Sequence, residues 1–492
     1  MSSTVAAHSA LPVTAEERTP FDAFFDGLVE GDVVEALNRG LIGKGLTIDG
    51  PFGPKTMVYA DYVASGRALR QIETFMLEEV LPFYANSHTE ASFCGATTTR
   101  LREAARKVVG DACGAGDEHA VIFTGSGATA GLNRLVHLFG IDAAVKAGEM
   151  PVVLVGPYEH HSNILPWRES GALVIEIGEA AEGGPDMAEL REALEAHRAA
   201  PVLVGAFSAA SNVTGILSDI DAVTALLKAF GARVVWDYAC AAPYVPIAMT
   251  AGGAEIDAIA LSAHKFIGGP GASGILIVRR DAVSAMTPSW PGGGTVLFVS
   301  SVFHDYLERI EDREEAGTPN IVGDIRAALV FLVKAAVGEA FIAERNRQLV
   351  AHAFDRWRGH PRIEVLGGEE HARLPVFSFR VRDGEGYVPQ QLFTRMLSDA
   401  FGIQTRGGCV CAGPYAHRLL GIDPETSQHL REEILGGDET HKPGFTRLNL
   451  SYLMDDETVD FILDSVVELA ENLDAFAARY ADRPEVAICR PM

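Results

Sequence analysis

Short apolar runs that alternate with helical patterns dominate residues 120–278 of this 492-residue chain, and they constrain its fold more than any other feature. Helical periodicity lies between several runs, for instance at 187–198 and 218–230, where Ser218 and Asp221 form a start that is typical of a capping box. Strands that alternate with helices favour a mostly parallel sheet covered on both faces. The sequence therefore predicts an α/β domain. The runs occupy residues 120–124, 151–155, 172–177, 201–207, 233–237, 257–261 and 274–278.

The pattern changes near residue 326, where a long helical stretch is followed by short strands such as 376–382 and a final helix near 457–478. This change indicates a second, smaller α+β domain. We expect an N-terminal segment at 1–55 that packs on the small domain, a large domain at 56–325 and a small C-terminal domain at 326–492.

Composition and charge argue against several classes of protein. The chain has 66 acidic residues and 41 Lys and Arg, a formal net charge of −25, and no basic run, which argues against a nucleic-acid partner. It lacks a signal-peptide pattern and any apolar stretch of about 18 residues, so we expect no membrane association and a cytoplasmic location. Six cysteines in so long a chain do not indicate a disulfide framework.

Polar residues follow the apolar runs, at the sheet edge where α/β proteins bind their ligands. The glycine-rich turn "GSGATAGLN" opens a helix, and its N–H groups, with Ser126 and Thr129, could hold a phosphate. Asp237 ends the run at 233–237, and Lys265 follows the run at 257–261 within "LSAHKFIGGPGASG". A phosphate anchor, a partner for a ring nitrogen and an amine for a Schiff base are what pyridoxal phosphate (PLP) requires. These residues therefore predict a PLP site.

The chain resembles fold-type I PLP enzymes of the class V aminotransferase group, and most closely the group II cysteine desulfurase and selenocysteine lyase branch. The resemblance extends from "VYADYVASG" (58–66) to "RLNLSYLMDDETVDFI" (447–462), and "EHHSNILPW", "SAHKFIGGPGASG" and "EAGTPN" lie between them in the family's order. It implies a large domain with a mostly parallel seven-stranded sheet and a smaller α+β domain. It also implies that Lys265 is the Schiff-base lysine and that His160 stacks on the pyridine ring. Other implied cofactor ligands are Ser126, Gly127, Ala128, Thr129, Asn212, Asp237, Ser262, His264 and, reaching the partner subunit of a homodimer, Thr318.

The segment "GIQTRGGCVCAGPYAHRLLGI" (402–422) determines the reaction that the resemblance implies. Arg406 precedes Cys411 by five residues, which is the spacing of the desulfurase nucleophile. Arg447 falls where the family binds the substrate α-carboxylate, a bidentate task suited to guanidinium, and His88 falls where relatives have an active-site histidine. The resemblance thus implies an enzyme that removes sulfur or selenium from cysteine or a related amino acid. A persulfide on Cys411 would pass to an acceptor protein or small molecule, and alanine would be released.

Departures from the family pattern leave alternatives open. Cys409 and Cys411 form a C-x-C arrangement closer to the molybdenum-cofactor sulfurase branch, Cys240 stands where the family commonly has glutamine, and 421–446 is longer than usual. The alternative function is another class V enzyme, an aminotransferase, epimerase or non-sulfur lyase, for which Cys411 would be incidental. Only one imidazole can stack on the cofactor, so His161 is expected to be structural. No second close pair of ligands completes a tetrahedral set with the two cysteines, so no metal is expected.

Overall fold

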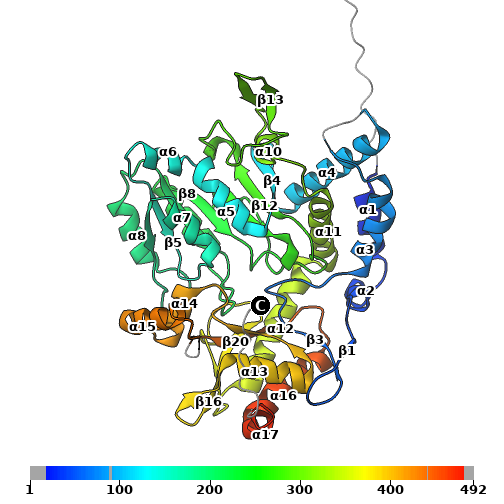
Figure 1. The fold of residues 1–492 in the computed structure, drawn as a ribbon, viewed down its shortest axis with the longest axis vertical. Helices are drawn as coiled ribbons and strands as arrows, with labels where there is room; N and C mark the ends of the chain where they lie inside the picture. Colours follow the sequence, from blue (N-terminus) through cyan, green and yellow to red (C-terminus); the bar gives the residue numbers. More distant parts are fainter. Residues whose placement is uncertain (1–17, 88–90, 440–441, 481–492) are drawn as a thin grey trace, which may run out of the picture.

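Seven strands form the central sheet of the large lobe (Figure 1). Each strand coincides with one of the apolar runs. The order is β4-β12-β11-β8-β7-β5-β6, and β12 alone runs antiparallel to its neighbours. The computed structural model describes residues 18–87, 91–439 and 442–480, and it confirms the predicted mostly parallel sheet. The strands are β4 (His119–Gly125), β5 (Val152–Val155), β6 (Leu173–Glu176), β7 (Leu203–Ser208), β8 (Arg233–Asp237), β11 (Ala258–Ser262) and β12 (Gly274–Arg279).

Helices cover both faces of this sheet because alternate side chains of a strand point to opposite faces. Val152 and Leu154 of β5 belong to one buried cluster, which includes Ile325 of α11, whereas Val153 and Val155 belong to a second cluster with Leu132 of α5. The two apolar clusters cover the two faces of the sheet. The polar residues at the strand ends therefore lie at one edge of the sheet. The helices of this lobe are α4 (Phe93–Ala112), α5 (Gly127–Leu138), α6 (Ile141–Lys146), α7 (Leu165–Glu169), α8 (Met187–Ala196), α9 (Ile220–Ala229), α10 (Ile310–Glu314) and α11 (Ile321–Val337).

The start of α9 differs from its prediction. Asp219 is the N-cap, and its carboxylate accepts the N–H of Ala222 at 2.9 Å. The hydroxyl of Ser218 instead donates to the carbonyl of Ser208 at 2.7 Å. The capping box predicted at Ser218 is therefore wrong, because the Ser218 side chain hydrogen-bonds to the end of β7 and does not cap α9.

A five-stranded antiparallel sheet forms the small lobe, in the order β15-β16-β20-β19 with β17 paired to β16. The helical stretch predicted from residue 326 is two helices, α11 and α12, separated at Gly338, which has a φ of +87°. Since α11 packs in the large-lobe core, the expected boundary at 325 and 326 falls inside a helix, and we propose the boundary at Gly338. The elements are α12 (Glu339–Trp357), β15 (Ile363–Val365), β16 (Val376–Asp383), β17 (Gly386–Tyr387), α13 (Gln390–Met396), β18 (Ile403–Gln404), β19 (Arg406–Gly408), α14 (Gly413–Leu420), α15 (Pro424–Leu435), β20 (Phe445–Asn449), α16 (Asp456–Glu471) and α17 (Leu473–Ala477).

The N-terminal segment connects the two lobes. Phe21, Leu28 and Leu37 lie in the large-lobe core cluster, so the expectation that this segment packs on the small domain is wrong for its helices. Phe52 does pack against the small-lobe core, and β3 pairs in parallel with β18 of that lobe. The segment thus contacts both lobes. Its elements are α1 (Pro20–Val29), α2 (Val33–Gly40), β1 (Thr47–Ile48), β2 (Lys55–Thr56) and β3 (Val58–Tyr59), followed by α3 (Arg70–Phe75).

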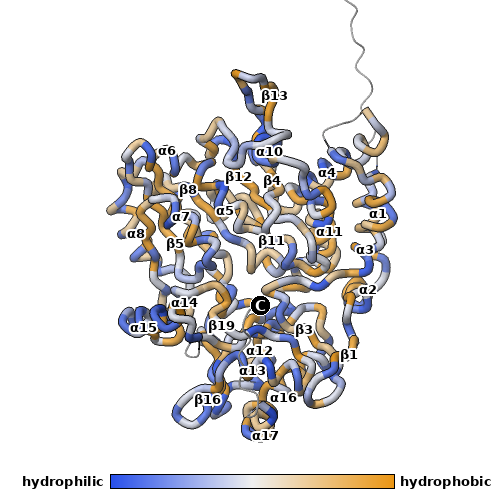
Figure 2. The backbone as a smooth tube through the Cα atoms, in the orientation of Figure 1, coloured by the Kyte–Doolittle hydropathy of each residue, from blue (hydrophilic) through white to orange (hydrophobic). Residues whose placement is uncertain are grey.

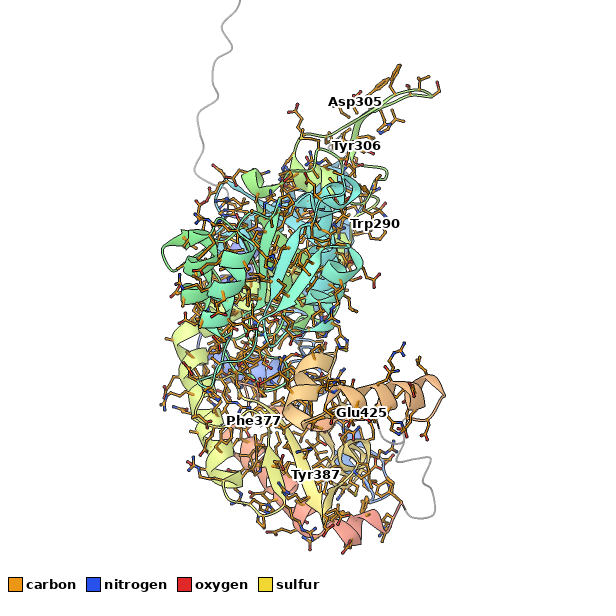
Figure 3. The ribbon with its side chains drawn as sticks, turned by 90° about the vertical axis from the view of Figure 1, so that its left-hand side faces the viewer. Trp290, Asp305, Tyr306, Phe377, Tyr387 and Glu425 are labelled. Atoms are coloured by element: carbon orange, nitrogen blue, oxygen red, sulfur yellow. The ribbon has the colours of Figure 1, made fainter. Side chains whose placement is uncertain are left out.

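A hairpin of β13 (Val296–Val299) and β14 (His304–Tyr306) projects from the large lobe, as Figure 1 and the side view with Asp305 and Tyr306 in Figure 3 show. Its apolar residues, visible as hydrophobic colour in Figure 2, are solvent-exposed, and Leu297, Val302 and Phe303 are 70–73% exposed. In the small lobe, α15 also projects from the body, with Glu425 near its start (Figure 3). Within the described ranges, no helix combines the length and apolar character needed to span a membrane.

Candidate active site

A pocket of about 240 Å³ lies where the carboxyl ends of the sheet strands face the small lobe. It brings together most of the residues that the sequence predicted for the site. Thr318 does not line it and is exposed, and its predicted place in a partner's site stays a prediction. His88 lies outside the described residues. The predicted residues that line the pocket are Ser126, Gly127, Ala128, Thr129, His160, Asn212, Asp237, Ser262, His264, Lys265, Arg406, Cys411 and Arg447.

Two neighbouring strands deliver the lysine and the carboxylate. Asp237 ends β8 and pairs in register with Ala260 of β11, whereas Lys265 lies on the short 3-10 turn that follows β11. Burial lowers the pKa of Lys265, which favours its neutral, nucleophilic amine. Burial raises the pKa of Asp237, which is 4% exposed, and the N–H of Ala239 donates to its Oδ1 at 2.8 Å. A buried carboxylate of this kind requires a cationic or protonated partner.

The turn between β4 and α5 forms a cradle of N–H and hydroxyl groups. Gly127 has a φ of +63°, and a Cβ at this position would lie 2.9 Å from Ser262 Oγ, so a side chain would fill the cradle. The N–H of Ala128 donates to the same Ser262 Oγ at 2.9 Å, and the hydroxyls of Thr129 and Ser162 lie 2.7 Å apart. The positive end of α5 and these hydroxyls suit a phosphate group.

The histidines at the pocket are uncharged. Burial lowers the pKa of His160 to about 3 and that of His264 to about 4. The N–H of Ser162 donates to His160 Nδ1 at 3.1 Å, so the ring proton of His160 lies on Nε2. A neutral, oriented imidazole on the pocket wall is suited to stacking against an aromatic ring. Ser162 was not predicted as a site residue, although it is two residues beyond His160 in "EHHSNILPW".

Glu159, next to His160, ties two strand ends together. It is 3% exposed, and its carboxylate accepts the N–H of Ser208 at 2.8 Å and the Ser208 hydroxyl at 2.7 Å. Burial raises the pKa of Glu159 to about 7. The contact fixes the loop that carries His160 against the end of β7. Ser208 also lines the pocket, and its place directly after an apolar run was a signal that could have identified it.

The two cysteines of the C-x-C arrangement have different surroundings. The Cys411 thiol is exposed and lines the pocket, whereas the thiol of Cys409 is partly buried and donates to the carbonyl of Pro443 at 2.8 Å. Burial raises the pKa of Cys409. Cys240 also lines the pocket, and burial raises its pKa to about 11, so this residue stays a thiol. Cys411 is therefore the pocket thiol that solvent and a ligand can both reach.

Two arginines from neighbouring strands share one carboxylate. Arg406 of β19 and Arg447 of β20 are paired in register. Asp61 accepts a hydrogen bond from Arg447 Nη2 at 2.8 Å through Oδ1 and from Arg406 Nε at 3.0 Å through Oδ2. Arg447 also donates through Nη1 to the carbonyl of Asn212 at 2.9 Å. Asp61 was not predicted as a site residue, and its only signal was its place in "VYADYVASG".

These residues fit PLP. The cradle at Gly127 has the donors for a phosphate, Asp237 is a buried acceptor for a protonated ring nitrogen, and Lys265 is a buried amine. Asn212 Oδ1 is buried and has no hydrogen-bond partner within the protein, which marks a polar atom that faces a ligand site. By contrast, the His, Cys, Asp and Glu side chains of the described ranges form no group of three or more that could hold a metal ion.

A mostly parallel sheet with a lysine, a carboxylate and a phosphate cradle at its carboxyl edge is the arrangement of a fold-type I PLP enzyme. The chain belongs to the class-V aminotransferase family, whose model matches residues 58–460, and it is therefore a PLP-dependent enzyme. A cysteine desulfurase from Klebsiella pneumoniae is 29% identical over 363 residues, which cover 74% of this chain and 86% of that protein. A probable cysteine desulfurase from Staphylococcus aureus is 27% identical over 371 residues, with 75% and 86% covered. The fold also matches the cysteine desulfurase structure from Thermococcus onnurineus, with a TM-score of 0.69 at 24% identity over 84% of this chain and 95% of that one.

Proposed function

We propose that this enzyme removes sulfur or selenium from cysteine or a related amino acid, through a persulfide on Cys411, and releases alanine. One observation carries the proposal: the Cys411 thiol lines the same pocket as Lys265 and the paired arginines. The cysteine desulfurases among its relatives support the same reaction. An aminotransferase or epimerase would not need a thiol at this position.

Each residue has a role that follows from its chemistry. When bound, PLP supplies a sink for the electrons released at the substrate Cα. Arg447, with Arg406, would bind the substrate α-carboxylate, Asp237 would hold the ring nitrogen, and His160 would pack against the ring. The buried amine of Lys265 moves the proton at the substrate Cα.

The sulfur step uses the Cys411 thiolate. Its Sγ attacks the substrate sulfur, an S–S bond forms and the substrate Cβ–S bond breaks. The electron pair of the broken bond stays with the carbon skeleton, and Cβ takes up a proton, so that cysteine and the enzyme thiol become alanine and the enzyme persulfide.

Mass spectrometry of the cysteine-treated enzyme tests this reaction. We expect a Cys411 persulfide and alanine formation in the wild type, and neither of them in Cys411→Ala. Cys409→Ala is the matched control and should retain at least part of the activity. A persulfide on Cys409 alone would reverse the assignment, and full alanine production by Cys411→Ala would favour the alternative class V reactions.

We also propose a homodimer with composite active sites, in which the loop with Thr318 reaches the partner's phosphate site. The exposed apolar hairpin β13–β14 supports it, because such a large apolar patch is typical of an interface, and the hairpin precedes the Thr318 loop in the chain. Light scattering should find a dimer in the wild type and a monomer of low activity in Leu297→Asp/Phe303→Asp. Leu435→Asp, on exposed α15, is the control and should remain dimeric. A fully active wild-type monomer would contradict this proposal.

The persulfide would then pass to an acceptor, a protein or a small molecule, and the exposure of Cys411 suits both. Cys94, Cys113, Cys240, Cys409 and Cys411 are free thiols, which supports a reducing compartment, and we propose a cytoplasmic location.

A further inference from the structure

The turn that carries Cys411 has a costly backbone conformation. Val410 has a φ of 45° and Cys411 a φ of 58°, and among the described residues these are the only ones other than glycine with a positive φ. A β-branched residue such as valine is disfavoured in this left-handed region. Such a conformation persists only where the surrounding structure holds it, and it often marks a functional site.

Hydrogen bonds from the large lobe hold this turn. The side chain of Asn212 donates through Nδ2 to the carbonyl of Val410 at 2.8 Å. The main-chain N–H of His161 donates to the carbonyl of Cys411 at 2.8 Å. The ring of His161 accepts, at Nε2, the N–H of Gly413 at 3.0 Å. His161 is therefore hydrogen-bonded to the carbonyl of Cys411 and to the N–H of Gly413, the first residue of α14. These two groups lie on either side of Ala412.

The approach of this ring is close. A Cβ at Gly413 would lie 3.1 Å from His161 Nε2, so the glycine permits the contact. The rings of His160 and His161 have centroids 6.1 Å apart and are inclined by 45°, so they are not stacked on each other. These consecutive histidines thus have different positions: His160 lines the pocket, and His161 contacts the turn that carries Cys411.

We propose that His161 is a positioning residue for Cys411, which keeps Val410 and Cys411 in their left-handed conformation and so holds the thiol at the pocket. The inference rests on the proposed function, in which Cys411 is the nucleophile. The sequence pattern assigned His161 only a structural part. The geometry assigns it a specific effect on the sulfur step and none on binding of the substrate carboxylate, which the arginines perform.

The test compares two substitutions in the full-length, PLP-loaded enzyme. His161→Phe keeps a ring but removes the acceptor for the Gly413 N–H, whereas His161→Gln places an amide oxygen near the position of Nε2. In a single turnover with cysteine, we expect His161→Phe to form the Cys411 persulfide about 100-fold more slowly, the cost of a misplacement of about 1 Å. The affinity for cysteine, followed by the change in visible absorption, should stay within about threefold of the wild type. His161→Gln should recover part of the rate.

Amide hydrogen exchange gives a second readout that does not depend on turnover. Peptides that contain Gly413 should exchange faster in His161→Phe than in the wild type, and His161→Gln should be intermediate. His197→Phe, at the end of α8 and outside the pocket, is the control and should change neither the persulfide rate nor this exchange. Wild-type persulfide formation and exchange in His161→Phe would overturn the inference. If the wild type itself forms no persulfide on Cys411, the proposed function fails instead, and exchange at Gly413 still reports whether His161 holds the turn.

Discussion

Replacement of Asp61 tests whether its carboxylate holds Arg406 and Arg447 in position to bind a substrate carboxylate. Asp61 is 7% exposed, and Arg447, whose Nη2 donates to its Oδ1, is 3% exposed. Arg406, which donates to Oδ2, has a side chain that is 51% exposed. Asp61→Ala leaves a buried guanidinium without its counter-charge, whereas Asp61→Asn keeps the shape and one acceptor oxygen.

The expected magnitudes follow from these burials. Breaking a buried ion pair by removing one partner costs about 3–5 kcal/mol, and this applies to the pair with Arg447. The half-exposed pair with Arg406 adds at most about 1 kcal/mol. Asp61→Asn weakens charged hydrogen bonds without removing them all, so we expect it to cost about 2 kcal/mol. The free energy of unfolding should therefore fall in the order wild type, Asp61→Asn, Asp61→Ala.

Urea unfolding of the purified enzyme measures these differences, and steady-state kinetics measures the effect on substrate binding. We expect KM for cysteine to rise about tenfold in Asp61→Asn, which corresponds to about 1.4 kcal/mol, with a smaller change in kcat. The control is Asp281→Ala, which removes an exposed partner of Arg279 and should cost less than about 1 kcal/mol. If Asp61→Ala unfolds within about 1 kcal/mol of the wild type, the buried pair does not stabilise the fold as we have reasoned.

Three further predictions concern the cofactor site. The purified enzyme should show the visible absorption of bound PLP, and Lys265→Ala should lose that band; a colourless wild type that cannot be reconstituted with PLP would contradict the assignment of Lys265. Asp237→Ala should bind PLP weakly and lose most turnover, because the ring nitrogen loses its acidic partner, and unchanged activity would remove Asp237 from the site. The pKa of His264 falls from 6.5 to about 4 on folding, so its contribution to stability is complete above pH 6.5 and is lost as the pH falls toward about 4. Unfolding free energies measured across this range should decrease less steeply in His264→Asn than in the wild type, and equal slopes would refute this cause.

The sheet and its ligand edge were predictable because they depend on local patterns. Each of the seven apolar runs became a strand, and polar residues at or soon after the strand ends, such as Asp237 and Lys265, met at one edge because parallel strands end together. The family motifs then identified Cys411 and Arg447 as pocket residues. These signals lie in short stretches that can be read without knowledge of the tertiary structure.

The contacts that organise the site were not predictable in the same way. Asp61 meets Arg447 across 386 residues and Arg406 across 345, and no local pattern encodes such a meeting. The left-handed turn at Val410 and Cys411 was also missed, because neither residue type favours a positive φ and the hydrogen bonds that hold it come from the other lobe. The cap at Asp219 was missed because a neighbouring serine matched the same local pattern.

The pairing of Asp61 with Arg447 has a consequence for how the protein is made. All strands of the central sheet have been synthesised by residue 279, but Arg447 follows Asp61 by 386 residues, a delay of about 20–80 s at ribosomal rates of roughly 5–20 residues per second. During that interval the Asp61 carboxylate lacks its partner Arg447. The turn at Val410 and Cys411 and the small-lobe side of the pocket have not yet formed. The nascent large lobe can fold as a unit on the ribosome, but an amino acid can be bound and its sulfur extracted only after nearly the whole chain has been released.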